Sequence, residues 1–360
     1  MPKPSLDWLL IFVPITVGLH YGMPDAHTQI FLCACLAILP LAGWLGKGTE
    51  NLACHTGEAV GGLLNATFGN AAELIIAIAA MRSGLYDVVK ASLTGSIIGN
   101  VLLVAGLSMF AGGLRYKTQT FNRMAAQNQA TMLLLAAVSL IMPAAYHYLA
   151  GPAAAAHEGD ISMEISIILL LVYAASLVFT LITHKALFGS EGGEAHGGEA
   201  QPWSVGKSMA VLAGATALIA WVSEILVGSV EHAAHAFGMT SIFVGVIVVA
   251  IIGNAAEHST AILVARKNRM DLALGIAIGS SIQIALFVAP VLVLMSYFLA
   301  PSPMNLVFTP AEVLAVTLSV LICAQTANDG ECNWMEGIQL LAVYAILGVV
   351  FYFLPDAHVR

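Results

Sequence analysis

Long apolar stretches dominate the chain, separated by short polar or Gly- and Pro-containing connections. A helix needs about 20 apolar residues to cross the hydrocarbon core of a bilayer, and most of these stretches reach that length. They cover residues 8–22, 28–46, 59–81, 88–112, 125–149, 162–187, 207–228, 237–265, 271–299, 308–327 and 336–355. The pattern predicts an all-α polytopic membrane protein with about 11 transmembrane helices.

Composition supports this class and excludes others. Of the 360 residues, 59% are hydrophobic and only 9% are charged, whereas soluble domains carry about 25% charged residues. The formal net charge is −8, and the few lysines and arginines are scattered. A soluble fold and a nucleic-acid partner are therefore both excluded.

A five-residue motif, Gly-Asn-Ala-Ala-Glu, occurs at Gly69–Glu73 and again at Gly253–Glu257, 184 residues later. At this offset GNAAELIIAI matches GNAAEHSTAI at seven of ten positions, and Arg82 meets Arg266. Five spans per half give the two copies opposite directions across the membrane. Inverted repeats with a site near the midplane are typical of secondary transporters.

The repeats and a Gly-rich acidic segment, GSEGGEAHGGEAQ, divide the chain. Because this segment is rich in glycine and acidic residues, it cannot form a hydrophobic core, and we expect it to be a flexible linker between the two halves. The first stretch has no clear small-residue cleavage site, which favours a spanning helix over a signal peptide. We expect an N-terminal transmembrane helix over 1–27, a first five-helix repeat over 28–188, the acidic linker over 189–206 and a second five-helix repeat over 207–360.

The distribution of positive charges predicts the orientation. With the N-terminus inside, the inner connections hold ten Lys and Arg residues and the outer ones hold three. Such an excess favours the cytoplasmic side. The linker is then cytoplasmic and the C-terminus lies outside.

The repeated polar residues are oxygen ligands. Asn70 and Glu73 share one helix face, as do Asn254 and Glu257, since each pair is three residues apart. The following helix of each half adds hydroxyls and amides: Ser96 and Asn100 in the first, Ser280, Ser281 and Gln283 in the second. The predicted metal ligands are Glu73, Glu257, Asn70, Asn254, Ser96 and Ser280. Such a set suits a hard cation, and calcium tolerates its irregular geometry better than magnesium. Asn100 is a weaker candidate, because Ile284 is its counterpart.

The same glutamates predict proton coupling. Two carboxylates in one low-dielectric site cannot both stay ionised when the cation leaves, so protons should replace it. His258 follows Glu257 and is either a proton relay or a hydrogen-bonded packing residue. Glu73, Glu257, His258 and Gln283 are the predicted proton-coupling residues. Glycines crowd the first motif helix and mark the helix that follows it, and such small residues tolerate a local break that frees backbone carbonyls for an ion. The carbonyls of Gly69 and Gly253 are therefore further ligand candidates.

The paired GNAAE motifs, each followed by a helix containing Gly-Ser, resemble the cation/proton exchanger family, the calcium/proton antiporters of the calcium:cation antiporter superfamily. The resemblance covers nearly the whole chain. It implies that Glu73 and Glu257 bind calcium and carry protons. It also implies export of cytosolic Ca²⁺ in exchange for H⁺ by alternating access, with Ca²⁺ as a substrate and no cofactor.

The residues are also compatible with other functions. A sodium-coupled or broader divalent cation exchanger of the same superfamily is the main alternative, and a cation channel is a weaker one. An intramembrane metalloprotease is disfavoured because HExxH is absent. The expected location is a prokaryotic cytoplasmic membrane, or else a vacuolar one. Ca²⁺, H⁺ and the lipid bilayer are the expected partners, and a homo-oligomer is possible.

Overall fold

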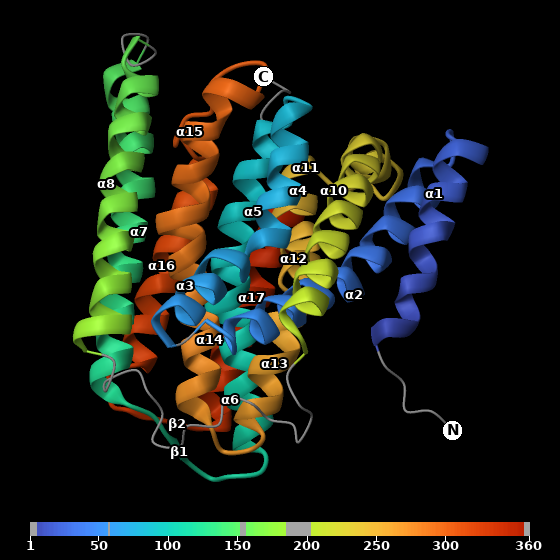
Figure 1. Ribbon diagram of the computed structural model, residues 1–360. Coiled ribbons are helices and arrows are strands. Elements are labelled where there is room, and N and C mark those ends of the chain that lie inside the picture. The colour runs from blue at the N-terminus through green and yellow to red at the C-terminus, as the bar shows by residue number, and fades with distance from the viewer. Residues whose placement is uncertain (1–5, 57, 152–155, 185–202, 356–360) are drawn as a thin grey trace. The chain divides into compact units, whose positions relative to one another are not determined.

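The computed structural model describes residues 6–56, 58–151, 156–184 and 203–355, nearly all of them helical (Figure 1). The predicted linker lies outside the described residues up to position 202. The chain forms two compact units. Unit 1 takes the described parts of Met1–Ser92, Gly198–Ala256 and Tyr352–Arg360, and unit 2 takes those of Leu93–Gly197 and Glu257–Phe351.

Unit 1 begins with a 3₁₀ turn, Leu6–Ile11, and contains helices from both sequence repeats. They are α1 (Phe12–Gly22), α2 (His27–Ala53), α3 (Glu58–Phe68), α4 (Ala71–Arg82), the first half of α5 (Tyr86–Ile98), α10 (Val205–Ala236), α11 (Ser241–Phe243) and α12 (Ala250–Gly253). A π-helical segment, Val244–Val249, joins α11 to α12.

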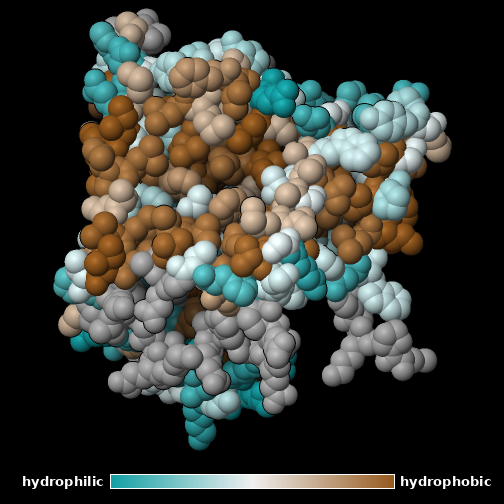
Figure 2. Space-filling view, viewed as in Figure 1, coloured by the Kyte–Doolittle hydropathy of each residue, from teal (hydrophilic) through white to brown (hydrophobic). Residues whose placement is uncertain are grey.

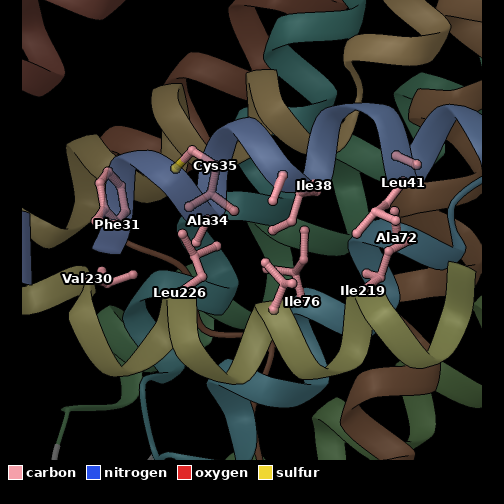
Figure 3. Packing of buried hydrophobic residues seen from close by; sticks show 14 of the residues in the cluster. Phe31, Ala34, Cys35, Ile38, Leu41, Ala72, Ile76, Ile219, Leu226 and Val230 are labelled. Atoms are coloured by element: carbon pink, nitrogen blue, oxygen red, sulfur yellow. The ribbon is translucent and has the colours of Figure 1, made fainter. Parts of the chain in front are cut away.

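The core of unit 1 lies between α2 and α10, which run side by side (Figure 3). Ala34 and Ile38 of α2 face Ile219 and Leu226 of α10, and none of the four is more than 1% exposed. Small residues let the two backbones approach closely, as in other membrane helix pairs. Ile76 of α4 packs into the same cluster, so the first motif helix is attached to this core.

Unit 2 contains the remaining helices. They are the second half of α5, α6 (Ala105–Gly113), α7 (Arg123–Ala150), α8 (Glu158–Val178), α13 (Ala255–Ala265) from Glu257 onward, α14 (Met270–Gln283), α15 (Ala289–Leu299), α16 (Pro310–Thr326) and α17 (Trp334–Phe353) up to Phe351. Two short strands, β1 (Gln119–Thr120) and β2 (Glu331–Cys332), pair antiparallel. In Figure 1, α7 packs beside α16 and α8 beside α15.

Local sequence explains where two of these helices begin. The Asn122 side chain accepts a hydrogen bond from the backbone N–H of Ala125 and so caps α7. At α16, Thr309 and Glu312 form a reciprocal capping box around Pro310. Each cap satisfies backbone groups that the first helical turn leaves without partners.

The outer face of α8 is apolar. Ile168 is 55% exposed and Leu171 is 66% exposed, and Figure 2 shows hydrophobic side chains gathered over α7 and α8. Water would not stabilise such a surface, whereas lipid chains do. This confirms the predicted class, an all-α membrane protein.

Among the described residues, seven helical segments are long and apolar enough to cross a membrane, and a bent pair gives up to eight. The seven are His27–Ala53, Tyr86–Gly113, Arg123–Ala150, Glu158–Thr183, Val205–Ala236, Met270–Leu299 and Trp334–Phe353. Two further apolar helices, Leu6–Gly22 and Pro310–Thr326, are shorter, and the predicted stretch 59–81 is divided into α3 and α4. The count of eleven spans therefore stays a prediction.

The two sequence repeats share a backbone irregularity. A π-helical segment, Gly99–Val104, separates α5 from α6, and another, Ile284–Val288, separates α14 from α15. At the offset of 184 their starts differ by one position. π-helical turns inside helices are uncommon and occur often at functional sites.

Candidate functional site

The first copy of the motif lies at a break between two helices. α3 ends at Phe68 and α4 begins at Ala71, and Asn70 between them has a non-helical backbone (φ −100°, ψ 22°). Glu73 therefore belongs to the first turn of α4. The free N–H groups and the positive end of the helix dipole favour a carboxylate there.

The second copy repeats this arrangement. α12 ends at Gly253 and α13 begins at Ala255, with Asn254 between them at φ −92° and ψ 3°. The two helical segments are bent by 60° at this break. Glu257 again occupies the first turn of the following helix. The repeated sequence thus produces a repeated local structure.

Within unit 1, Gly253 of the second motif copy lies against Glu73 of the first. A Cβ atom at Gly253 would be 3.2 Å from Cγ of Glu73 and 3.4 Å from its Oε1. Glycine leaves this space to the carboxylate. The contact joins residues that are 180 positions apart in sequence, and it brings a backbone group of one copy next to the glutamate of the other.

The motif asparagines are buried, each at 1% exposure. The side-chain Nδ2 of Asn254 donates to the carbonyl of Ala250 at 2.9 Å. Asn254 thereby uses its amide nitrogen to hold the end of α12, and only its amide oxygen is suited to a cation. Asn70 caps the start of α4 through its backbone carbonyl, which accepts from the N–H of Leu74.

In unit 2, Glu257 is the last member of a hydrogen-bonded chain. His258 Nε2 lies 3.2 Å from Oδ1 of Asn100. Asn100 Nδ2 donates to the Ser280 hydroxyl at 3.1 Å, and that hydroxyl donates to the Glu257 carboxylate. Since the Asn100 amide donates through nitrogen, its oxygen accepts, and the His258 Nε2 must carry a proton.

This series of hydrogen bonds involves two of the residues predicted beside Glu257, Ser280 and His258, and also the weaker candidate Asn100. Ser280 contacts Glu257 directly, as a ligand or supporting residue would. His258 lies beside Glu257 in sequence but contacts Asn100, which agrees with a hydrogen-bonded position. Asn100 had a low weight from sequence, because its repeat counterpart is Ile284. The structure places it, 1% exposed, at the centre of the chain.

Two more of the predicted site residues, Ser96 and Gln283, lie on helices of unit 2. Ser96 is buried on α5 at 4% exposure. Gln283 is half-buried and is the last residue of α14, where the π-helical segment begins. Their roles stay predictions.

Sequence reasoning missed a further buried carboxylate, which lies on α16. Glu312 is 2% exposed. Its Oε1 accepts from the hydroxyl of Thr94 at 3.1 Å, and its Oε2 accepts from the N–H and hydroxyl of Thr309. The Thr-Pro-Ala-Glu sequence is a recognisable capping box, but the bond to Thr94 of α5 spans 218 residues and has no sequence signal.

The two motif segments of unit 1 differ in exposure. Val60 of α3 is 50% exposed, whereas its repeat counterpart, Val244, is fully buried. Asn65 is exposed, whereas its counterpart Val249 is 5% exposed. The inverted halves therefore hold their equivalent segments in different environments.

Comparison with known proteins identifies the family. The family model described as sodium/calcium exchanger protein matches residues 26–182 and 207–353. The chain belongs to this family. The chain is similar to a Ca(2+)/H(+) antiporter of Aphanothece halophytica, which is 44% identical over 361 residues, with 96% of each chain covered. The Ca(2+)/H(+) antiporter ChaA of Bacillus subtilis is 46% identical over 345 residues, covering 95% of this chain and 97% of that protein.

A solved structure agrees with this assignment. The structure of native YfkE has a TM-score of 0.84 and 42% sequence identity, and the match covers 97% of this chain and 100% of that one. The resemblance to calcium/proton antiporters is therefore confirmed at the level of family and fold.

Proposed function

We propose that this membrane protein is a calcium/proton antiporter that exports cytosolic Ca²⁺ in exchange for H⁺. One observation carries the proposal: the same glutamate occurs twice, each time in the first turn of a helix that follows a break at an asparagine. Relatives of matching length are named as Ca(2+)/H(+) antiporters, which supports the same reaction. The protein acts as a secondary transporter and not as an enzyme.

Glu73 and Glu257 supply the two negative charges that neutralise a calcium ion. Asn70, Asn254, Ser96 and Ser280 supply neutral oxygens, either to the ion or to the glutamates. Calcium accepts six to eight oxygen ligands in flexible geometry, and this mixture of carboxylate, amide and hydroxyl suits it. The contact of Gly253 with Glu73 supports a site to which both motif copies contribute.

The charge of the two glutamates explains why protons are the counter-ion. A calcium-loaded pair and a doubly protonated pair are both neutral and can be exposed to either side at similar cost. An empty, ionised pair carries two charges in a low-dielectric environment and moves at a much higher cost. Calcium and protons therefore replace each other. The chain from His258 through Asn100 and Ser280 holds one carboxylate in position during this exchange.

The unequal exposure of the two motif segments supports alternating access. The α3 side of Glu73 contains exposed residues, whereas its counterpart around Val244 and Val249 is packed. With the orientation inferred from the positive residues, the α3 segment faces the cytoplasm. We infer that the structure represents a state in which calcium enters from the cytoplasm. The expected location is a prokaryotic cytoplasmic membrane with the N-terminus inside.

Transport by proteoliposomes separates this function from sodium-coupled exchange. Purified protein in liposomes loaded with calcium should release or accumulate it when a pH gradient is imposed, and should not respond to a sodium gradient of equal size. Protein-free liposomes control for leakage. Calcium flux driven by sodium alone would support the sodium-coupled alternative, and flux without any coupling gradient would indicate a channel.

A further inference from the structure

Four exposed cations gather at one end of unit 2. Arg115 and Lys117 follow α6, and Arg266 and Lys267 follow α13; we call these four residues the basic patch. Figure 1 shows α6 and α13 ending at the same end of the unit. Arg115 Nη1 donates to the backbone carbonyl of Arg266 at 3.3 Å, so the two loops are in contact.

A buried amide holds the two loops together beneath the basic patch. Gln119 is 1% exposed, and its Nε2 donates to the carbonyl of Ala265 at 2.9 Å and to Oδ1 of Asn268 at 3.0 Å. The backbone N–H of Asn122 donates to the carboxylate of Asp271, which adds a second link. The positions of the loop backbones are thus determined by side chains of unit 2 itself.

No ion pair with the described residues neutralises the charges of the basic patch. Within the described part of the chain, none of its four side chains has a carboxylate within 4.0 Å. Elsewhere the structure does pair cations: Lys47 with Asp7, and Arg82 with Glu224.

Three carboxylates at the same end of unit 2 accept backbone hydrogen bonds and do not pair with the basic patch. Asp329 accepts from the N–H of Glu331 at 3.2 Å, and Glu336 accepts from the N–H of Asn333 at 3.0 Å. Asp271 accepts from Asn122, as described above. The basic patch therefore presents positive charge outward.

Exposed leucines lie directly beside these cations. Leu114 precedes Arg115 and is 69% exposed, and Leu263 lies one helical turn before Arg266 and is 55% exposed. A free phosphate or a nucleic acid offers no group for these apolar side chains. A phospholipid offers an anionic headgroup for the cations and acyl chains for the leucines.

We propose that the basic patch binds the headgroup of an anionic phospholipid, with its acyl chains against Leu114 and Leu263. Clusters of Lys and Arg at the ends of membrane helices attract anionic headgroups. The requirement for positive residues on the cytoplasmic side is met by cations anywhere in those loops, and it does not explain why two loops meet to form one patch. Because α13 carries Glu257, a bound lipid steadies the end of a motif helix. The proposal needs only that the chain lies in a membrane.

Native mass spectrometry of the purified full-length protein tests this directly. Protein in detergent is given equal amounts of phosphatidylglycerol and phosphatidylcholine, and the retained lipids are counted. Wild type should retain phosphatidylglycerol in preference. In the double variant Arg266→Gln/Lys267→Gln this preference should fall about tenfold, since each cation near an anionic surface is worth about one kcal/mol or less.

The matched control removes two cations that already have partners. Lys47 pairs with Asp7, and Lys207 lies over the ring of Trp203 at 4.4 Å. The variant Lys47→Gln/Lys207→Gln should keep the wild-type preference. An equal loss in both double variants would mean that general charge attracts the lipid, and would overturn the proposal.

Two further outcomes would also overturn it. One is wild-type retention of phosphatidylglycerol by the Arg266→Gln/Lys267→Gln variant, provided that its elution profile shows a folded protein. The other is displacement of the lipid by an excess of inorganic phosphate, which would assign the basic patch to free phosphate. Charge reversal at Arg115 (Arg115→Glu) gives an independent check and should reduce the preference further.

Discussion

Each motif glutamate is the third residue of its helix. Glu73 and Glu257 follow an asparagine with non-helical backbone by three positions. In hydrocarbon an isolated carboxylate costs roughly 2.5–3.5 kcal/mol on insertion scales. The first turn of a helix reduces this cost, because its N–H groups and dipole favour negative charge. The helix break at each asparagine therefore lowers the free-energy cost of placing a glutamate in an apolar segment.

Replacement of either glutamate tests the charge requirement. Glu73→Gln and Glu257→Gln keep the side-chain shape but each removes half of the neutralising charge. Each should reduce calcium/proton exchange at least ~100-fold, because leaving one charge of a buried pair uncompensated costs about 3 kcal/mol or more. Flux in proteoliposomes measures this, and gel filtration checks that the variants are folded. Near wild-type flux in either variant would refute a mechanism that needs both carboxylates.

The series of hydrogen bonds that links His258 to Glu257 through Asn100 and Ser280 predicts that substitutions within it have coupled effects on calcium affinity. Asn100→Ala and Ser280→Ala should each weaken calcium affinity by about 5- to 10-fold, since a hydrogen bond contributes about 1 kcal/mol. The loss of calcium affinity in the double variant should be smaller than the product of the two single losses, because both substitutions interrupt the same series of hydrogen bonds. Calorimetric calcium titration of the purified proteins measures all three.

Ser281→Ala is the control for this cycle. The Ser281 hydroxyl bonds to the carbonyls of Ala277 and Ile97 and takes no part in the chain. Its removal should leave calcium affinity unchanged. Strictly additive effects of the Asn100 and Ser280 substitutions would show that the chain does not act as a unit.

At the residue scale, sequence alone selected the two glutamates as site candidates because the motif occurs twice. It could not assign a role to Asn100, because the repeat comparison pairs this residue with Ile284. The contact of Asn100 with His258 also spans 158 residues and leaves no local pattern in the sequence. The bond from Thr94 to Glu312 was missed for the same reason. Contacts made by single polar residues on otherwise apolar helices depend on tertiary packing.

At the element scale, the helix breaks distinguish the two motif segments from the other spans. The predicted stretches 59–81 and 237–265 each contain such a break, at Asn70 and at Asn254. Hydropathy could not locate either, because the apolar character continues through the break on both sides. Periodicity also fails where a helix is apolar all round. Glycine enrichment indicated that a break was tolerated, but not its position.

Gly253 offers a test at this scale. Gly253→Val would place methyl groups in the space of the Glu73 side chain, whose Cγ lies 3.2 Å from a Cβ at this position. The variant should lose calcium binding by at least ~10-fold, because displacing a ligand by about 1 Å removes its bond to the ion. Calcium titration measures the loss. Gly228→Val is the control, since nothing lies within 4 Å of a Cβ there. Equal affinities of both variants and wild type would show that the close contact of the two motif copies has no role in binding.

At the scale of the whole molecule, the compact units do not follow the sequence halves. Unit 1 combines α2 and α4 with α10 and α12, and unit 2 combines α7 and α8 with α14 to α17. Sequence showed the repeat through one ungapped offset. It could not show that elements of both repeats pack together, because apolar helices match many partners equally well in composition.

Reporter fusions test the arrangement of the whole chain in the membrane. A reporter placed within residues 189–201 should lie in the cytoplasm, and one placed after Arg360 should lie on the opposite side. The reason is that the inner connections hold ten positive residues and the outer connections hold three, an excess that favours the cytoplasmic side. A phosphatase reporter active only outside and a fluorescent reporter active only inside give the two readings. Both fusions on the same side would contradict an odd number of spans in the second half, and with it the inverted repeat.

Calcium binding as a function of pH tests the central claim most directly. Both glutamates must be ionised to hold calcium and protonated when it leaves, so lowering the pH must weaken binding and calcium must release protons. Titration of the purified protein from about pH 8 down to about pH 5, a range that extends towards the ordinary carboxyl pKa values, measures both. We expect affinity to fall steadily with pH and protons to appear in weakly buffered solution when calcium is added. Affinity that is constant over this range, with no proton release, would contradict calcium/proton exchange at this site.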